Sequence, residues 1–214
     1  MEVKESTKAK EVDTKEGYDQ WSSSYEDDSN PLIVLEEVAL SEMLPDLTLK
    51  DAVDLGCGTG RNSKKLRNLG ARVHAVDFSE GMLEVARRKY SASGIIFERA
   101  DLQKPLAFPD KAFDLVLCTL VIEHIQFLPP TLREMGRICR TKGQIIISDL
   151  HPAMKLKDAQ AHFTDPMTGI EIKPKGFPHS RSMTSANIPA RKILPLPVPK
   201  WKSISIGPCS LFSD

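Results

Sequence analysis

Apolar residues follow two spacings along the chain, one typical of β-strands and one typical of α-helices. Between residues 32 and 43, and again between 131 and 138, they recur with a helical period. Because such segments alternate with short apolar strands, the pattern predicts an α/β fold with a doubly wound, mostly parallel sheet. Five runs have the length and apolar character of strands buried on both faces: residues 52–55, 72–76, 95–98, 113–118 and 144–148.

Capping signals place the ends of the other helices. The helix after the first strand should end at Gly70, because glycine readily adopts the left-handed conformation found at helix ends. Ser79 is a good N-cap for the next helix, which we expect to run to about residue 91. The helix that starts near Pro130 should end at residues 142–143, where lysine precedes glycine.

The two ends of the chain differ in composition from this core. Residues 1–15 are rich in lysine and glutamate, and we expect them to be disordered. Residues 16–180 are expected to form one domain, which is long enough for a substantial core. Residues 181–214 form a basic, proline-rich tail, and the proline run at 194–199 favours a polyproline II conformation.

Past residue 149 the alternation of helices and strands weakens. Residues 165–169 are typical of a turn, and residues 202–206 could supply one short edge strand. We find no second strand to complete the C-terminal antiparallel hairpin. The sheet edge beyond the strand at 144–148 should therefore be covered by residues 150–180 or by a partner chain.

The segment after the first strand carries three glycines at alternate positions, Gly56, Gly58 and Gly60. Such a turn lets the backbone approach a bulky ligand that side chains would exclude. Asp77 ends the second strand, where a carboxylate can accept hydrogen bonds from both hydroxyls of a ribose. A dinucleotide site needs a small residue at the position of Arg61, so the pattern argues against a nicotinamide oxidoreductase.

These residues resemble the motifs of a known family. Residues 53–60 resemble the first motif of the class I S-adenosylmethionine-dependent methyltransferases, and residues 75–79 resemble the next. The core looks like that of the small-molecule methyltransferases acting on quinones and sterols, over roughly residues 17–180. The resemblance implies a Rossmann-like fold, S-adenosyl-L-methionine as cofactor, and direct in-line methyl transfer to a small-molecule acceptor.

The resemblance also implies which residues bind the cofactor. Asp77 would bind the ribose, and Asp101 would accept a hydrogen bond from the adenine amino group beside Leu102. Asp54 would lie near the cofactor's ammonium group or brace the loop, and Cys57 would be a small filler. The full set is Tyr18, Tyr25, Asp54, Gly56, Cys57, Gly58, Gly60, Asp77, Phe78, Ser79, Met82, Asp101, Leu102, Thr119 and Leu120.

Two pairs in this set have a simpler interpretation. Tyr18 and Tyr25 resemble an N-terminal lid, which excludes water and fixes the approach of the methyl donor. They could instead brace the helix at residues 32–43. Phe78 and Met82 would flank the adenine as apolar walls, but they could equally belong to the core.

Two histidines are candidate catalytic bases. His151 follows the fifth strand and His124 follows the fourth, so both should lie on the same side of the sheet. His124 could instead be a helix-start residue bonded to nearby backbone. The histidines and cysteines lack the spacing of metal ligands, so we expect no metal site.

Composition argues against several other classes of protein. The chain has 29 basic and 29 acidic residues, so no net charge attracts nucleic acid or anionic lipid. The longest apolar run, residues 115–122, is too short to span a membrane, and the N-terminus lacks an apolar signal segment. The four cysteines form no C-x-x-C pair, which fits free thiols in the reducing cytoplasm.

One alternative function stays open at this point. The protein could bind the cofactor but turn over weakly, with residues 181–214 serving a protein interaction through their proline run. An incomplete sheet would leave the acceptor pocket open. We therefore expect measurable cofactor binding with weak or absent turnover.

Overall fold

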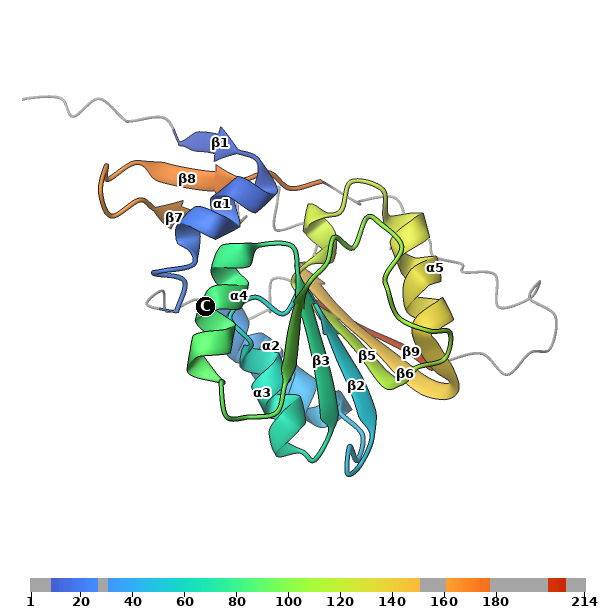
Figure 1. Ribbon diagram of the computed structural model, residues 1–214. Helices are drawn as coiled ribbons and strands as arrows, with labels where there is room; N and C mark the ends of the chain where they lie inside the picture. The colour runs from blue at the N-terminus through green and yellow to red at the C-terminus, as the bar shows by residue number, and fades with distance from the viewer. Residues whose placement is uncertain (1–8, 27–30, 151–160, 178–199, 207–214) are drawn as a thin grey trace, which may run out of the picture.

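A computed structural model describes residues 9–26, 31–150, 161–177 and 200–206 of the chain. Its centre is a six-stranded sheet in the order β4-β3-β2-β5-β6-β9, in which every neighbouring pair is parallel (Figure 1). The predicted doubly wound α/β fold is therefore confirmed. The strands of this sheet are β2 (Asp51–Leu55), β3 (Arg72–Asp77), β4 (Ile96–Arg99), β5 (Phe113–Thr119), β6 (Cys139–Leu150) and β9 (Lys200–Ile206).

Helices cover both faces of the sheet (Figure 1). Three of them lie on one face, and α5 lies on the other with the short 3-10 helix η1 near its start. The helices are α2 (Pro31–Met43), α3 (Arg61–Asn68), α4 (Glu80–Lys89), η1 (Ile122–His124) and α5 (Leu128–Ile138).

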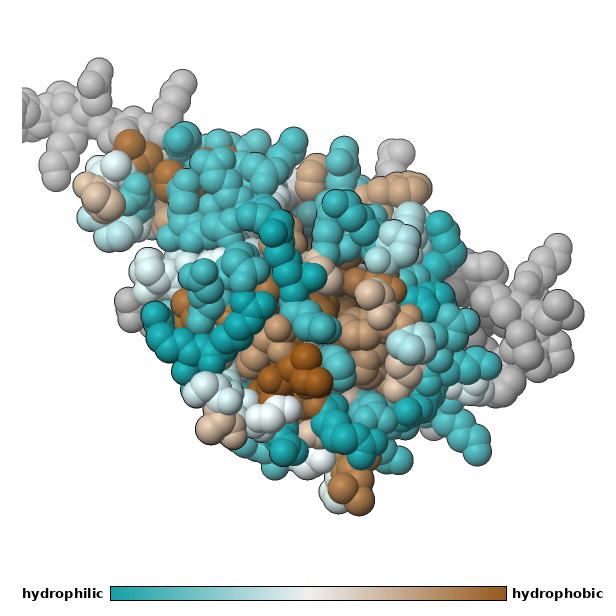
Figure 2. Space-filling model, viewed as in Figure 1, coloured by the Kyte–Doolittle hydropathy of each residue, from teal (hydrophilic) through white to brown (hydrophobic). Residues whose placement is uncertain are grey.

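The central strand β5 contributes side chains to two hydrophobic cores, one on each face of the sheet. Leu115 and Leu117 are buried on the side of α2 and α3, whereas Val116 and Cys118 are buried on the side of α5. Successive side chains of a strand point to opposite faces, so a wholly apolar strand can pack against helices on both sides. On the face shown in Figure 2, apolar atoms also reach the surface between α4 and α5.

Two predicted helix ends are confirmed and one is wrong. The side chain of Ser79 accepts a hydrogen bond of 3.1 Å from the backbone N–H of Met82, as an N-cap does. Gly70 has a φ of +92°, the left-handed conformation expected after α3. The helix α5 ends at Ile138, several residues early, because Cys139 has an extended backbone and already belongs to β6.

A second, three-stranded sheet joins distant parts of the chain, in the order β1-β8-β7. The expectation that residues 1–15 are disordered is wrong for residues 10–15, because β1 pairs in parallel with β8 and α1 follows at once. Local composition could not show this, since β1 is held by a strand about 160 residues away. The elements are β1 (Lys10–Val12), α1 (Thr14–Trp21), β7 (Phe163–Thr164) and β8 (Glu171–Pro174).

The predicted turn at residues 165–169 connects β7 to β8. The Asp165 carboxylate accepts a hydrogen bond of 2.8 Å from the backbone N–H of Met167, and Gly169 has a φ of +68°. A carboxylate that binds backbone two residues further on is typical of turns. The turn is therefore confirmed.

The edge of the large sheet beyond β6 is covered by β9, which pairs in parallel with residues 144–150. The predicted edge strand at 202–206 is thus present, although it starts at Lys200. The expectation that residues 150–180 or a partner chain cover this edge is wrong, because the backbone groups of β6 are already paired. Among the described residues, β9 is the last strand of this sheet, and no antiparallel hairpin follows β6.

Candidate functional site

A cavity of about 880 Å³ opens at the carboxyl ends of β2, β3, β4 and β5. Parallel sheets bind ligands at this edge, where the loops that follow the strands converge. Of the predicted site residues, Gly60 and Ser79 do not line the cavity, and His151 lies outside the described residues. The predicted residues that do line it are Tyr18, Tyr25, Asp54, Gly56, Cys57, Gly58, Asp77, Phe78, Met82, Asp101, Leu102, Thr119, Leu120 and His124.

The three glycines of the loop have different roles. All three have positive φ angles, of +75° for Gly56, +54° for Gly58 and +85° for Gly60. A Cβ atom on Gly58 would meet no atom within 4 Å, so this residue faces the open cavity. A Cβ atom on Gly60 would lie 3.1 Å from the ring of Phe97, so Gly60 permits close packing and not ligand approach.

Asp77 is held in place by the backbone around it. Its two carboxylate oxygens each accept a hydrogen bond of 2.9 Å, one from the N–H of Gly58 and one from the N–H of Ser79. Burial raises the pKa of Asp77, although these two hydrogen bonds oppose the rise. Each oxygen keeps a further acceptor position, so the carboxylate can still bind a ligand hydroxyl.

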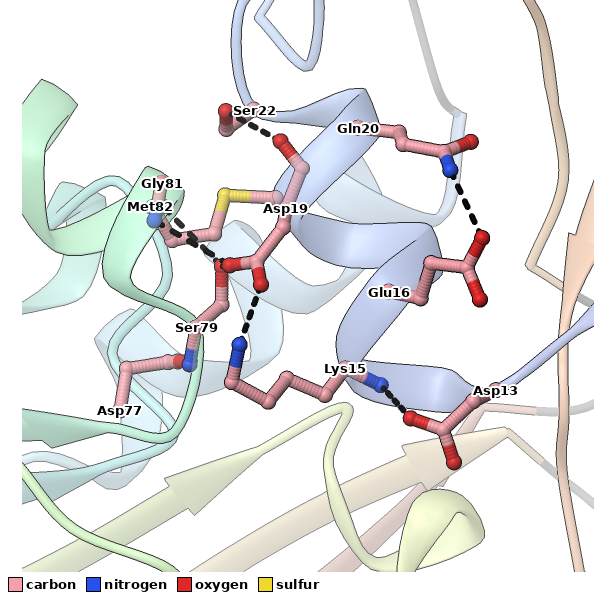
Figure 3. Close-up of polar contacts among 10 residues, drawn as sticks. All are labelled: Asp13, Lys15, Glu16, Asp19, Gln20, Ser22, Asp77, Ser79, Gly81 and Met82. Carbon is pink, nitrogen blue, oxygen red and sulfur yellow. Dashed lines mark hydrogen bonds and ion pairs between the residues drawn. The ribbon is translucent and has the colours of Figure 1, made fainter.

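The Ser79 side chain is engaged within the protein and does not line the cavity. It caps α4, and its hydroxyl donates a hydrogen bond of 2.6 Å to the Asp19 carboxylate (Figure 3). The same carboxylate accepts from the backbone N–H of Gly81 at 3.2 Å and pairs with Lys15. Burial alone would raise the pKa of Asp19, but the bonds from Lys15, Ser79 and Gly81 lower it.

Helix α1 contributes Tyr18 to the cavity wall. The hydroxyl of Tyr18 lies 2.9 Å from Nε2 of His124, and Nδ1 of His124 lies 3.0 Å from the carbonyl oxygen of Lys175. A carbonyl only accepts, so Nδ1 must carry a proton. In neutral His124 the other ring nitrogen, Nε2, then accepts from the Tyr18 hydroxyl. Burial raises the pKa of Tyr18 well above its usual value, which keeps that hydroxyl protonated.

The adenine end predicted at Asp101 also lies on the cavity wall. Asp101 and Leu102 follow β4, and one Asp101 oxygen accepts a hydrogen bond of 2.9 Å from the N–H of Gln103. Cys57 is buried, and burial raises the pKa of its thiol well above the usual value. A protonated thiol is a poor nucleophile, which agrees with the interpretation of Cys57 as filler.

Comparison with known proteins agrees with this geometry. The methyltransferase domain family matches residues 53–147. An uncharacterized methyltransferase of Emericella nidulans, AN0656, is 30% identical over 206 residues, which cover 78% of this chain and 71% of the relative. The chain belongs to the class I S-adenosylmethionine-dependent methyltransferases.

Two further similarities place the core in this family. A demethylmenaquinone methyltransferase of Clavibacter sepedonicus is 34% identical over 137 residues, or 62% of this chain and 56% of the relative. The crystal structure of an S-adenosylmethionine-dependent methyltransferase from Mesorhizobium loti has a TM-score of 0.52 and 36% identity. The match covers 55% of this chain and 54% of the Mesorhizobium loti chain. The chain thus spans only about half the length of these two proteins.

The methyltransferase cavity also has buried polar atoms on Asp54, which the sequence predicted as a site residue, and on Arg61 and Asn62, which it did not. Among the described residues, Asp54 Oδ1, Arg61 Nη1 and Asn62 Oδ1 are buried without a hydrogen-bond partner. All three residues line the cavity. They provide one cationic donor and two acceptors, which complements the carboxylate and ammonium groups of the cofactor's amino-acid end.

The partners of these side chains hold them in place. The other Asp54 oxygen accepts a hydrogen bond of 2.6 Å from Ser63, and burial raises the pKa of Asp54 to about 6. Asn62 donates to the hydroxyl of Thr119 at 2.9 Å.

From the sequence, Arg61 indicates only that the loop does not fit a dinucleotide, and no ligand contact is predicted for it. Its second terminal nitrogen pairs with Glu36, which is fully buried and accepts a hydrogen bond of 2.8 Å from Ser148. Its position directly after the glycine loop was the available signal that it could reach a ligand.

The described part of the chain also bears on other classes of protein. No helix there has both the length and the apolar character needed to cross a membrane. Cys57, Cys118 and Cys139 are free and buried thiols.

Proposed function

We propose that this chain transfers the methyl group of S-adenosylmethionine to a small-molecule acceptor by direct in-line displacement. The observation that carries the proposal is the arrangement of polar atoms on the cavity wall. Acceptors for a nucleoside lie at β3 and β4, and the donor and acceptors for an amino acid lie at β2 and α3. A ligand that joins a nucleoside to an amino acid satisfies both groups at once.

Each end of the cofactor has its own residues in this proposal. Asp77 binds the ribose hydroxyls and Asp101 binds the adenine amino group. Arg61 binds the carboxylate, while Asp54 and Asn62 accept from the ammonium group. Bound in this way, the cofactor supplies an electrophilic methyl group on its sulfonium sulfur.

The protein contributes mainly position and the exclusion of water. Tyr18 and Tyr25 line the cavity, and in this proposal they act as the N-terminal lid that excludes water. Holding reactants in line can contribute about 7–11 kcal/mol to the lowering of a barrier. Small-molecule methyl acceptors differ widely in acidity, so a base is needed only when the acceptor arrives protonated.

His124 is the base that we assign to such acceptors, and it acts with Tyr18. An acceptor proton taken by the Tyr18 oxygen is matched by the Tyr18 proton passing to Nε2 of His124. The Lys175 carbonyl and the nearby Glu123 carboxylate then stabilise the imidazolium. His151, the stronger of the two candidates by its position in the sequence, lies outside the described residues and stays a prediction.

The alternative of a weakly active cofactor-binding protein is less well supported. Its expectation of weak turnover rested on an open sheet edge beyond β6, and β9 covers that edge. Its expected protein interaction rested on the proline run at residues 194–199, which lies outside the described residues. We therefore keep methyl transfer as the function.

Two measurements test the proposal. Calorimetric titration with S-adenosylmethionine and with NAD should show micromolar binding of the first alone. Release of S-adenosylhomocysteine should then be followed against a panel of phenols, carboxylic acids and amines. Binding of NAD without binding of S-adenosylmethionine would overturn the cofactor assignment. Cofactor binding without turnover on any acceptor would favour the alternative.

A further inference from the structure

The helix α2 presents apolar side chains to solvent. Val34, Leu35 and Val38 have exposed fractions of 63%, 47% and 60%. They are three and four residues apart, so they lie next to one another along the helix and form one stripe. We call these three residues the α2 stripe. Exposed apolar residues that lie next to one another are more informative than single ones, since contiguous patches mark binding surfaces.

The α2 stripe continues the cavity wall. Val34 and Leu35 line the cavity together with Ile33, and they are also exposed to solvent. The same side chains therefore bound the cavity and form its rim. A ligand that fills the cavity and extends past this rim would lie over Val38.

Most polar side chains elsewhere on the wall are already engaged. The atoms without partners belong to Asp54, Arg61 and Asn62, which β2 and α3 carry. Apolar contact is thus what α2 offers a ligand. The engaged pairs are Glu26 with Lys89, Tyr18 with His124, and Asn62 with Thr119.

The helix that carries the stripe is fixed to the rest of the site. Glu36, two residues before Val38, is fully buried and is bound to Arg61 and Ser148. Lys65 donates to the carbonyl of Glu37 at 3.1 Å and to the hydroxyl of Ser41 at 2.6 Å. The position of the stripe relative to the cofactor site is therefore defined by α3 and β6.

We infer that the methyl acceptor carries an apolar chain or ring system that leaves the cavity over the α2 stripe. This inference rests on the proposed function, because the acceptor is the ligand that remains once the cofactor groups are assigned. The stripe selects acceptors by apolar length, while the reacting group stays beside Tyr18. A second copy of this chain on the stripe is the competing occupant, and the experiment below separates the two.

The experiment measures binding of 4-alkylphenols, from methyl to octyl, to the protein saturated with S-adenosylhomocysteine. In the wild type, affinity should rise about fourfold per methylene until the chain has crossed the stripe. In the double variant V34T/V38T a hydroxyl replaces one methyl group of each valine, so the side chains keep their shape but become polar. Its affinity for octylphenol should fall at least tenfold, while its affinity for methylphenol should change little.

Control variants keep the result interpretable. Met167→Thr changes an exposed apolar residue in the turn between β7 and β8, and its chain-length dependence should match the wild type. V38T, which does not touch the cavity wall, should bind S-adenosylhomocysteine within twofold of the wild type. Failure of S-adenosylhomocysteine to bind the wild type would instead reject the proposed function.

Two outcomes would overturn the inference while leaving the proposed function standing. The first is affinity that does not depend on chain length in the wild type. The second is a dimer, seen by sedimentation, that V34T/V38T converts to a monomer without changing the binding of octylphenol.

Discussion

The Asp19 carboxylate accepts a hydrogen bond of 2.6 Å from the Ser79 hydroxyl, which ties α1 to the start of α4 (Figure 3). Ser79 directly follows the turn that holds Asp77, since its backbone N–H donates to the Asp77 carboxylate. A carboxylate at a helix N-terminus is also stabilised by the helix dipole. Asp19 of α1, which we propose as part of the N-terminal lid, and Asp77, which we propose as the ribose ligand, are thus linked through one serine.

Asp19→Asn should loosen the lid. The charged acceptor of the Ser79, Gly81 and Lys15 bonds is lost, so we expect about 1–2 kcal/mol lower stability against unfolding. Cofactor affinity should fall severalfold, because α1 carries Tyr18. Chemical denaturation and calorimetry measure the two effects. Glu16→Gln on the same helix is the control and should change neither. Equal cofactor affinity in Asp19→Asn and wild type would uncouple the lid from the site.

Asp77→Ala should weaken cofactor binding tenfold or more. Hydrogen bonds to a charged group contribute about 1.5–3 kcal/mol each, and the ribose would lose its acceptor. The variant also leaves the N–H groups of Gly58 and Ser79 without their carboxylate, so a lower melting temperature is expected. Asp77→Asn, which keeps the shape, should melt closer to wild type. A dissociation constant equal to that of the wild type would remove Asp77 from the site.

Arg61→Gln should destabilise the protein as well as weaken cofactor binding. It leaves the carboxylate of Glu36 buried without its cation. Breaking a buried pair costs about 3–5 kcal/mol, and we expect the lower end because the Arg61 side chain is 33% exposed. The double variant E36Q/R61Q should regain most of the stability. Its cofactor affinity should stay low, since the cationic donor is still missing. Full recovery of affinity in the double variant would show that Arg61 does not bind the cofactor.

Gly58→Val should abolish cofactor binding. Its Cβ would project into open cavity space, and a β-branched side chain is strained at a φ of +54°. Gly136→Ala is the matched control, because a Cβ there also meets nothing within 4 Å but lies on α5. Calorimetry on both variants, with circular dichroism to verify folding, checks this. If the Gly58→Val protein folds and binds the cofactor with wild-type affinity, the loop does not contact the cofactor.

Asp54 should make cofactor affinity depend on pH. Its pKa is about 6 in the folded protein because of burial, above the usual value for an aspartate. The folded state therefore binds the proton more tightly than the unfolded state, and stability should fall between about pH 4 and 6 as the carboxylate ionises. The ionised form accepts from the cofactor's ammonium group, so affinity should rise over about pH 5–7. Asp54→Asn should lose this rise and be more stable at pH 7. A pH profile identical in both proteins would contradict the assignment.

The features predicted correctly from the sequence are those that neighbouring residues control. The apolar runs specify β5 and the other strands of the parallel sheet, the Ser79 hydroxyl caps the helix that it precedes, and Gly58 allows a turn that few other residues tolerate. Each depends on backbone conformation within a few residues. Sequence pattern alone is sufficient for such features.

The features that were missed depend on contacts between distant segments. β1 forms because β8 provides a partner, and the edge beyond β6 is covered by the predicted strand β9 instead of by residues 150–180 or a partner chain. α5 ends early because the next residues pair with β5. In each case the partner strand comes from a distant part of the chain, so the local composition does not predict the pairing.

The same division runs through the site. The glycine loop and Asp77 were found from their spacing, but the pairing of Arg61 with Glu36 and of Tyr18 with His124 was not. Tyr18 and His124 are 106 residues apart, and no periodicity links them. Folding brings them within hydrogen-bond distance because α1 packs against β8 and the start of α4, and burial then makes their polar pairing necessary.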